Sequence, residues 1–323
     1  MSVRDRAARA LLCGLLVAGL ACVSAAGLAG GVKSAGYPRC FGAASRDPQH
    51  PCHNPALRLL VVPTPSEALI TPAAPCTLVP SAGPPEVCAF GVPPDQAVST
   101  FALIGDSHAA HWRAALEVVA QAKHWRGLSL DHSLCPLSLA YTMLREPLRT
   151  ECFQWRLQVF DWLNHHPEIQ TVVVSAHSGG AVQAAHGQRQ FAAKVEGFLA
   201  AWRALPPSVA HIIVIRNVPY SVQGMLACVS SAMTRHQPAG ELCERPRAIA
   251  LHRDPEVAAA QQLHSARVQV ADMTHFMCDR RWCFPVVGGA LVRKDLGHLT
   301  QVFSASLGPY LLRRIDRLAS RWR

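Results

Sequence analysis

The sequence has no internal repeat, no block of like charge and very few long apolar runs. After its first thirty residues no apolar run is long enough to cross a bilayer, so we expect no multi-span membrane core within these 323 residues. The 31 Lys and Arg outnumber the 21 Asp and Glu, but the basic residues are scattered, apart from a cluster at 313–323. Scattered basic charge does not favour nucleic acid, and it is compatible with anionic glycans or lipid headgroups.

The first thirty residues have the pattern of an export signal. Arg4, Arg6 and Arg9 precede an apolar run over residues 10–29, and small side chains at 24–26 suit a signal peptidase. The run of about twenty residues is also long enough to remain as an uncleaved membrane anchor. In either case we expect the rest of the chain to be exported to a periplasmic or other extracytoplasmic compartment.

Cysteine usage agrees with export. Ten cysteines lie outside the leader and form five neighbouring pairs, which in an exported chain indicates disulfides. Sequence does not fix connectivity, but the simplest pairing is local: Cys40 with Cys52, Cys76 with Cys88, Cys135 with Cys152, Cys228 with Cys243, and Cys278 with Cys283. The alternative is zinc held by His275, Cys278 and Cys283, which an oxidising compartment disfavours. We therefore expect neither a metal nor a cofactor.

Residues 31–97 differ in composition from the rest. Thirteen of the chain's 24 prolines fall between Pro38 and Pro94, together with four cysteines. This composition predicts an extended, disulfide-stapled arm that lies on the following domain or links it to the membrane. Within the arm, Arg58–Val62 is a candidate for one short strand.

From residue 98 to 323 the patterns of strands and helices alternate. We predict strands near 98–104, 127–131, 171–175, 210–216 and 267–272, and helices near 108–124, 151–166, 188–204, 247–265 and 300–320. The apolar runs at 172–174 and 212–215 are typical of parallel strands covered on both faces. The fold class is therefore α/β, a three-layer α/β/α arrangement with a flavodoxin-like doubly wound sheet. Its ligand crevice is expected beyond the carboxyl ends of the strands.

The first predicted strand ends in Gly105-Asp-Ser-His108. Gly105 permits a tight strand-to-helix turn, and Asp106 is a candidate cap for the helix. A hydroxyl at Ser107 would then face backbone N–H groups and the positive end of the helix dipole, which suits a nucleophile whose product is an oxyanion. Without further context, the same residues are equally those of an ordinary helix cap.

A second motif lies just before the last predicted helix. Asp295 and His298 are three residues apart on one loop, so the carboxylate can orient the imidazole and leave its other nitrogen free to accept a serine proton. Thr300 is the expected cap of the terminal helix. That helix would bury one apolar stripe, which consists of Phe303, Leu307, Tyr310, Leu311, Ile315 and Leu318.

These two motifs together resemble the SGNH/GDSL hydrolase superfamily. More narrowly, the chain is similar to the extracytoplasmic SGNH domains attached to membrane acyltransferases of the acyltransferase-3 type. In those domains the nucleophile stands in Gly-Asp-Ser-His and the base in Asp-x-x-His-Leu-Ser/Thr. The resemblance covers about residues 98–323, and three further motifs match: Cys135-Pro-Leu137, Asn217-Val-Pro219 and Cys278-Asp-x-x-x-Cys283.

The resemblance implies Ser107 as nucleophile, His298 as base and Asp295 as the residue that orients the base. The superfamily's oxyanion hole also uses a glycine after the second strand and an asparagine after the third, and this chain departs from that pattern. After the third strand it reads Val-Ser-Ala-His-Ser-Gly-Gly over residues 174–180, without asparagine. His177 or Ser178 could supply the missing donor, or the hole could rest on the Ser107 N–H alone. Losing one donor can cost about 2.7–4 kcal/mol of transition-state stabilisation.

The sequence therefore predicts an exported serine acyl-ester enzyme, an O-acetyltransferase or O-acetylesterase acting on a cell-envelope polysaccharide or other glycan. Its acyl group would come from elsewhere, and a separate membrane acyltransferase is one source. The choice between transfer and hydrolysis stays open. The alternative from another class is a non-catalytic glycan-binding module that keeps the fold but lost the oxyanion hole.

Overall fold

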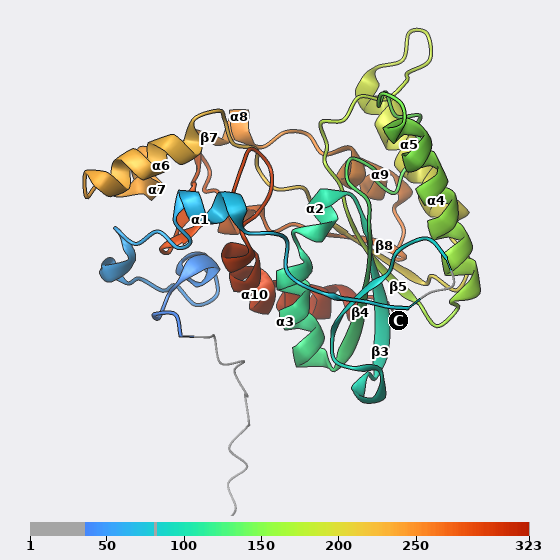
Figure 1. Cartoon of the computed structure of the whole chain (residues 1–323), viewed down its shortest axis with the longest axis horizontal. Helices are drawn as coiled ribbons and strands as arrows, with labels where there is room; N and C mark the ends of the chain where they lie inside the picture. Colours follow the sequence, from blue (N-terminus) through green and yellow to red (C-terminus); the bar gives the residue numbers. More distant parts are fainter. Residues whose placement is uncertain (1–35, 81–82, 323) are drawn as a thin grey trace, which may run out of the picture. The chain divides into compact units, whose positions relative to one another are not determined.

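The computed structural model describes residues 36–80 and 83–322 (Figure 1). The predicted export segment therefore lies outside the described residues. Within them, no helix combines the length and the apolar character needed to cross a membrane.

The centre of the molecule is a seven-stranded sheet in the order β1-β2-β4-β3-β5-β6-β8. Its strands are β1 (Thr77–Leu78), β2 (Cys88–Gly91), β3 (Ser99–Gly105), β4 (Trp125–Asp131), β5 (Thr171–Ser175), β6 (His211–Ile215) and β8 (Val268–Ala271). The last five in the chain are mutually parallel, and β1 and β2 run antiparallel at one edge. The register pairs Gly105 of β3 with Asp131 of β4 and with Ser175 of β5, so these three strands end side by side. The predicted α/β fold with a doubly wound parallel sheet is confirmed.

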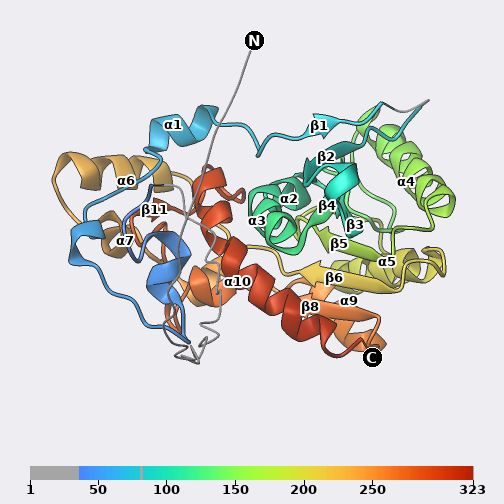
Figure 2. The same ribbon diagram turned by 90° about the horizontal axis from the view of Figure 1, so that it is seen from below.

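Both faces of the sheet are covered by helices, as Figures 1 and 2 show. Alternate residues of β3 face opposite ways: Phe101 and Leu103 pack towards α3 (Arg113–Lys123) and α10 (Gln301–Ala319), whereas Ala102 and Ile104 pack into the other core. That second core is covered by α4 (Leu148–His165), α5 (Gln190–Ala204) and α9 (Pro255–Leu263). Burial on both faces explains why the central strands are apolar without alternation.

The predicted helices differ from the observed ones mainly by interruptions. The expected helix 108–124 is divided into α2 (Ser107–Ala110) and α3. The expected helix 247–265 is divided into α8 (Arg247–Ala250) and α9, because Pro255 begins α9 and Asp254 caps it through the backbone N–H groups of Glu256 and Val257. As expected, Thr300 caps α10, its side chain accepting a hydrogen bond from Phe303 N at 3.1 Å.

The proline-rich arm is more structured than a simple extended segment. It contains three short 3₁₀ helices, η1 (Gly42–Arg46), η2 (Pro55–Leu57) and η3 (Pro94–Gln96), the helix α1 (Pro65–Ile70), and the two antiparallel strands β1 and β2 of the main sheet. The strand expected over Arg58–Val62 is wrong, because Val62 forms only an isolated bridge with Ala290. Sequence alone gave no sign that a proline-rich segment would extend the sheet.

A smaller satellite core lies beside the sheet, where Figure 2 shows α1 next to α6 (Met225–Thr234) and α7 (Ala239–Leu242). Ala68 of the arm, Val229 of α6 and Leu291 pack together there. Leu291 belongs to the hairpin of β10 (Val286–Val287) and β11 (Ala290–Leu291). The remaining described elements are the antiparallel pair β7 (Arg245–Pro246) and β9 (Trp282–Cys283) and the 3₁₀ helix η4 (Thr274–Phe276). The hairpin leads directly into the loop that carries Asp295 and His298.

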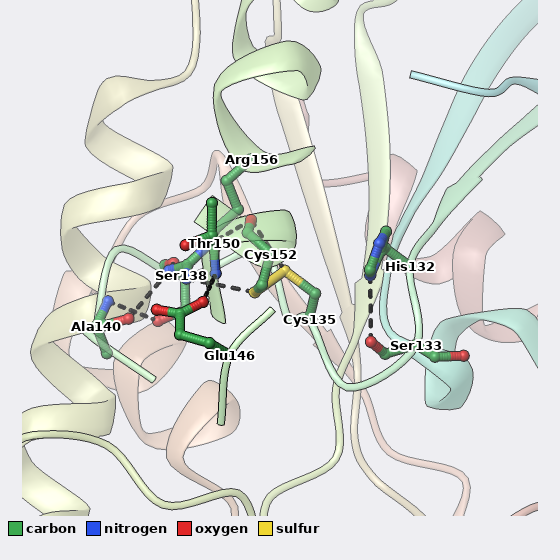
Figure 3. The surroundings of a disulfide bond; sticks show 9 residues. All are labelled: His132, Ser133, Cys135, Ser138, Ala140, Glu146, Thr150, Cys152 and Arg156. Carbon is green, nitrogen blue, oxygen red and sulfur yellow. Dashed lines mark hydrogen bonds between the residues drawn. A yellow bond between two sulfur atoms is a disulfide. The ribbon is translucent and has the colours of Figure 1, made fainter. Parts of the chain in front are cut away.

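All five predicted disulfides are present: Cys40–Cys52, Cys76–Cys88, Cys135–Cys152, Cys228–Cys243 and Cys278–Cys283. The last of these uses both cysteines of the alternative zinc site. Figure 3 shows how Cys135–Cys152 ties the loop after β4 to α4. Beside it, the buried guanidinium of Arg156 donates to the carbonyls of Ser138 and Ala140 on that loop. The loop after β4 is therefore held firmly at the carboxyl edge of the sheet.

Candidate active site

Ser107 lies at the turn between β3 and α2. A side chain in place of Gly105 would collide with the Ser175 carbonyl and with Ala109, so only glycine fits this turn. The buried carboxylate of Asp106 caps α2 by accepting the His108 N–H at 2.8 Å, and its second oxygen accepts the His177 N–H at 2.9 Å. Burial raises the pKa of Asp106 to about 6, although these backbone donors oppose the rise. Asp106 thus joins the ends of β3 and β5 and leaves the Ser107 hydroxyl to face another partner.

That partner is His298. Its Nε2 lies 2.8 Å from Ser107 Oγ, and its Nδ1 lies 2.8 Å from Asp295 Oδ2. The other carboxylate oxygen of Asp295 accepts the N–H groups of Gly297 at 2.9 Å and His298 at 2.7 Å. Burial raises the pKa of Asp295, but the hydrogen bonds from His298 and Gly297 outweigh burial and hold that pKa well below its usual range. The structure thus brings the three sequence-predicted residues into one hydrogen-bonded chain with an ionised carboxylate at its end.

The loop that carries His298 is fixed at its base. A bridge pairs Arg293 with Leu299, and Lys294 N donates to His298 O at 3.0 Å. The fully buried Arg293 guanidinium donates to the Pro219 carbonyl at 3.0 Å, and Ser221 N donates to Leu296 O at 2.7 Å. Burial lowers the pKa of Arg293 to about 10, so it stays charged at neutral pH. These contacts attach the loop to the segment after β6.

His108 packs directly against this loop. Its ring centroid is 4.7 Å from that of His298, and a side chain at Gly297 would run into the His108 ring. Its Nδ1 lies 2.7 Å from Asn217 Oδ1, which also accepts the Val218 N–H, so Nδ1 carries the proton. Burial and the neighbouring His298 lower the pKa of His108 to about 3, so it is neutral. A neutral ring at this position adds no positive charge beside His298.

The two candidate oxyanion residues lie near this cluster, but neither hydrogen-bonds to Ser107. The Ser178 hydroxyl lies 3.2 Å from the Tyr220 hydroxyl and accepts from Asn217 Nδ2 at 3.2 Å. The His177 ring packs 4.8 Å from the His108 ring, and its backbone N–H is used by Asp106. The third candidate donor is the backbone N–H of Ser107. It belongs to the nucleophilic residue itself and stands at the first position of α2.

Several site residues were missed by reasoning from the sequence. In the sequence Asn217 stands out only as part of an Asn-Val-Pro motif, yet its side chain connects His108, Ser178 and Tyr220. Leu134, on the loop after β4, adopts the left-handed region at φ 64°, a conformation that normally favours glycine. The sequence carries no signal for this conformation, because a leucine is not expected at a positive φ.

Ser107 and His298 open onto a cavity of about 310 Å³. This volume lies at the lower end of the roughly 300–1,000 Å³ of small-molecule sites. The lining residues come from the arm, from α2 and α3, from the edge of β4 and from the loop before α10: Ala73, Ala74, Ser107, Ala110, His111, Arg113, Asp131, Ser133, Lys294, Asp295, His298, Leu299 and Gln301.

A Ser-His-Asp chain at the carboxyl edge of a parallel α/β sheet is an arrangement found in several families of serine hydrolases and acyl-transfer enzymes. The sequence matches the family model of the SGNH domain (fused to AT3 domains) over residues 75–313. The chain therefore belongs to this family of SGNH domains. No curated protein sequence is significantly similar to the chain.

Several solved structures align with the chain at low sequence identity. The periplasmic domain of a lipopolysaccharide acetyltransferase from Salmonella ser. Paratyphi A aligns with a TM-score of 0.51 and 14% identity, over 70% of this chain and 90% of that one. A family two carbohydrate esterase from Clostridium thermocellum, solved with cellohexaose, gives 0.40 and 14% over 72% and 67%. An acetyl xylan esterase from the rumen bacterium Butyrivibrio proteoclasticus gives 0.35 and 10% over 72% and 66%.

Proposed function

We propose that this protein is an exported serine acyl-ester enzyme that transfers or removes an O-acetyl or similar short acyl group on a cell-envelope glycan. One observation carries the proposal: an unbroken chain of hydrogen bonds runs from Asp295 through His298 to Ser107, and Ser107 opens onto a cavity. The lipopolysaccharide acetyltransferase relative and the family's association with membrane acyltransferases support a glycan as substrate. The five disulfides support an oxidising, extracytoplasmic compartment.

The proposed reaction has two stages. Ser107 Oγ attacks the acyl carbonyl while His298 Nε2 takes its proton, and the bond from the carbonyl carbon to the donor oxygen breaks as that oxygen receives the proton. This gives an acyl-Ser107 enzyme and a free alcohol. In the second stage water or a sugar hydroxyl attacks the acyl carbon, loses its proton to His298 and releases Ser107. Asp295 holds the imidazole in the tautomer with Nδ1 protonated and stabilises the imidazolium that forms.

The acceptor of the acyl group distinguishes the two outcomes of the second stage. Attack by water makes the protein an esterase, and attack by a sugar hydroxyl makes it an acyltransferase. In the second case we propose that a separate membrane acyltransferase delivers the acyl group to Ser107, because SGNH domains of this family are fused to AT3 domains. The acyl-Ser107 adduct is common to both, so its detection by mass spectrometry is the most informative single measurement.

Hydrolysis of p-nitrophenyl acetate by the purified protein tests the proposal. We expect activity that disappears in Ser107→Ala and survives in Ser178→Ala, whose hydroxyl contacts Tyr220 and Asn217 rather than Ser107. The missing asparagine after β5 is the observation that favours the alternative, a glycan-binding module without turnover. Binding of acetylated glycans with no acyl adduct and no hydrolysis of any ester would support the module and contradict the enzyme.

A further inference from the structure

A segment of the arm, residues 71–74, passes along the cavity next to Ser107; we call it the strap. Its backbone carbonyls are clamped by side chains from three different elements. The three hydrogen bonds are Lys294 Nζ to Thr71 O at 2.9 Å, Gln301 Nε2 to Pro72 O at 2.8 Å and Arg113 Nε to Ala74 O at 2.8 Å.

All three clamping residues also line the cavity that Ser107 and His298 share. Arg113 begins α3, Lys294 is adjacent to Asp295, and Gln301 is the first residue of α10. The same side chains therefore hold the strap and line the cavity beside Ser107. Ala73 and Ala74 contribute the strap's own part of the cavity wall.

The strap is fixed at both ends. Before it, Thr71 caps the end of α1, and its N–H and hydroxyl donate to the Glu67 carbonyl at 3.1 and 2.7 Å. After it, the disulfide Cys76–Cys88 joins the chain to β2 of the main sheet. Arg113 extends the attachment, because its guanidinium also donates to Asp131 at 3.0 Å. A segment restrained in this way has the fixed geometry that a specific binding wall requires.

The cavity wall combines apolar and polar groups, and its positive and negative side chains are equal in number. Ala73 and Ala74 are apolar, Arg113 is paired with Asp131, and the lining holds two cations, Lys294 and Arg113, and two carboxylates, Asp131 and Asp295. Sugar rings present C–H faces and hydroxyl groups without net charge. A cavity of about 310 Å³ with this lining suits one uncharged sugar unit better than an anionic one.

We propose that the strap forms one wall of the glycan subsite and that it selects an uncharged O-acylated sugar residue whose ester reaches Ser107. This proposal rests on the function proposed above and adds the class of sugar and the segment that recognises it. The residues of the strap act by contact with the sugar, so changing them alters binding of sugar esters more than attack on an ester that carries no sugar.

The test compares two esters in the full chain. Glucose pentaacetate carries the sugar ring and p-nitrophenyl acetate does not, so the ratio of their KM values isolates the subsite from the chemistry at Ser107. In Ala73→Trp the indole fills the cavity, and we expect the KM for glucose pentaacetate to rise at least about tenfold more than the KM for p-nitrophenyl acetate. Leu78→Trp is the matched control, because residue 78 is exposed and lies beyond Cys76, outside the cavity lining; it should change neither KM by more than about twofold.

A second variant covers the case in which Ala73→Trp fails to fold. Gln301→Leu removes the hydrogen bond to Pro72 and one polar group from the cavity lining, and we expect a shift of the KM ratio in the same direction but smaller. Equal KM changes for both esters in either folded variant, or no change at all, would overturn the role of the strap. A wild-type protein that hydrolyses neither ester and forms no acyl-Ser107 adduct would instead refute the proposed function itself, so the two failures are distinguishable.

Discussion

Replacing Asp295 by asparagine separates the two tasks of this side chain. One oxygen holds the loop by accepting the N–H groups of Gly297 and His298 at 2.9 and 2.7 Å, and the other accepts from His298 Nδ1 at 2.8 Å. An asparagine can keep its oxygen on the backbone donors. Its amide nitrogen then faces Nδ1 and can only donate, which forces the imidazole proton onto Nε2. In that tautomer His298 can no longer accept the Ser107 proton.

The size of the effect follows from this change of tautomer. In a serine protease the equivalent substitution lowers kcat by about 10⁴-fold while the geometry stays intact. Here the side chain of Asp295 is 41% exposed, so water can compete for the imidazole, and we expect a loss of kcat between about 10-fold and 10⁴-fold. The assay is hydrolysis of p-nitrophenyl acetate at saturating ester. The matched control is Asp316→Asn, which removes a surface carboxylate paired with Lys123 and should leave kcat unchanged.

Stability provides an independent check on the same variant. The pKa of Asp295 is lower in the folded chain than in the unfolded one, so its carboxylate stabilises the fold above about pH 3.9, and this contribution is lost as the pH falls below that value. The gap in unfolding midpoint between wild type and Asp295→Asn should therefore close towards low pH. Full activity in a folded Asp295→Asn protein would mean that another group orients the base, and the reasoning from the hydrogen-bonded chain would be wrong.

Three further predictions concern other parts of the molecule. The pKa of Asp106 rises from 3.8 to about 6 on folding, so this group makes the wild type less stable as pH rises between those values. A scan of unfolding midpoints against pH should show that Asp106→Asn gains stability relative to the wild type over that range. Parallel curves for the two proteins would contradict the prediction. The double change Cys135→Ser with Cys152→Ser opens a disulfide that spans 17 residues and should lower the free energy of unfolding by about 2–4 kcal/mol in urea denaturation, whereas an unchanged midpoint would show that Arg156 alone holds the loop. The intact mass of the purified protein should be ten hydrogens below that of the reduced chain, as five disulfides require, and free thiols at Cys278 and Cys283 with bound metal would revive the zinc interpretation.

The parallel part of the fold was readable from the sequence because its signal is local. Uninterrupted apolar runs such as 172–174 are stable only when both faces of a strand are covered, and this requirement fixed the strands to within about two residues. The antiparallel edge was not readable. β1 has two residues and β2 four, too short for any periodicity, and their pairing depends on β4, which lies over thirty residues further along the chain. The same lack of a local signal hid α6, whose apolar face packs against the arm rather than the sheet.

The reactive residues could be predicted from the sequence, whereas the residues that support them could not. Asp295 and His298 are three residues apart, so their contact could be predicted from spacing, whereas Ser107 was nominated by its Gly-Asp-Ser-His motif and by the resemblance to SGNH hydrolases. Asn217 acts across more than a hundred residues: it fixes the proton of His108 on Nδ1, and the neutral His108 ring packs on His298 and requires Gly297 to be small. No spacing rule connects these positions. Each is constrained only by the volume and the hydrogen-bond capacity that the others leave, and those quantities exist only once the chain has folded.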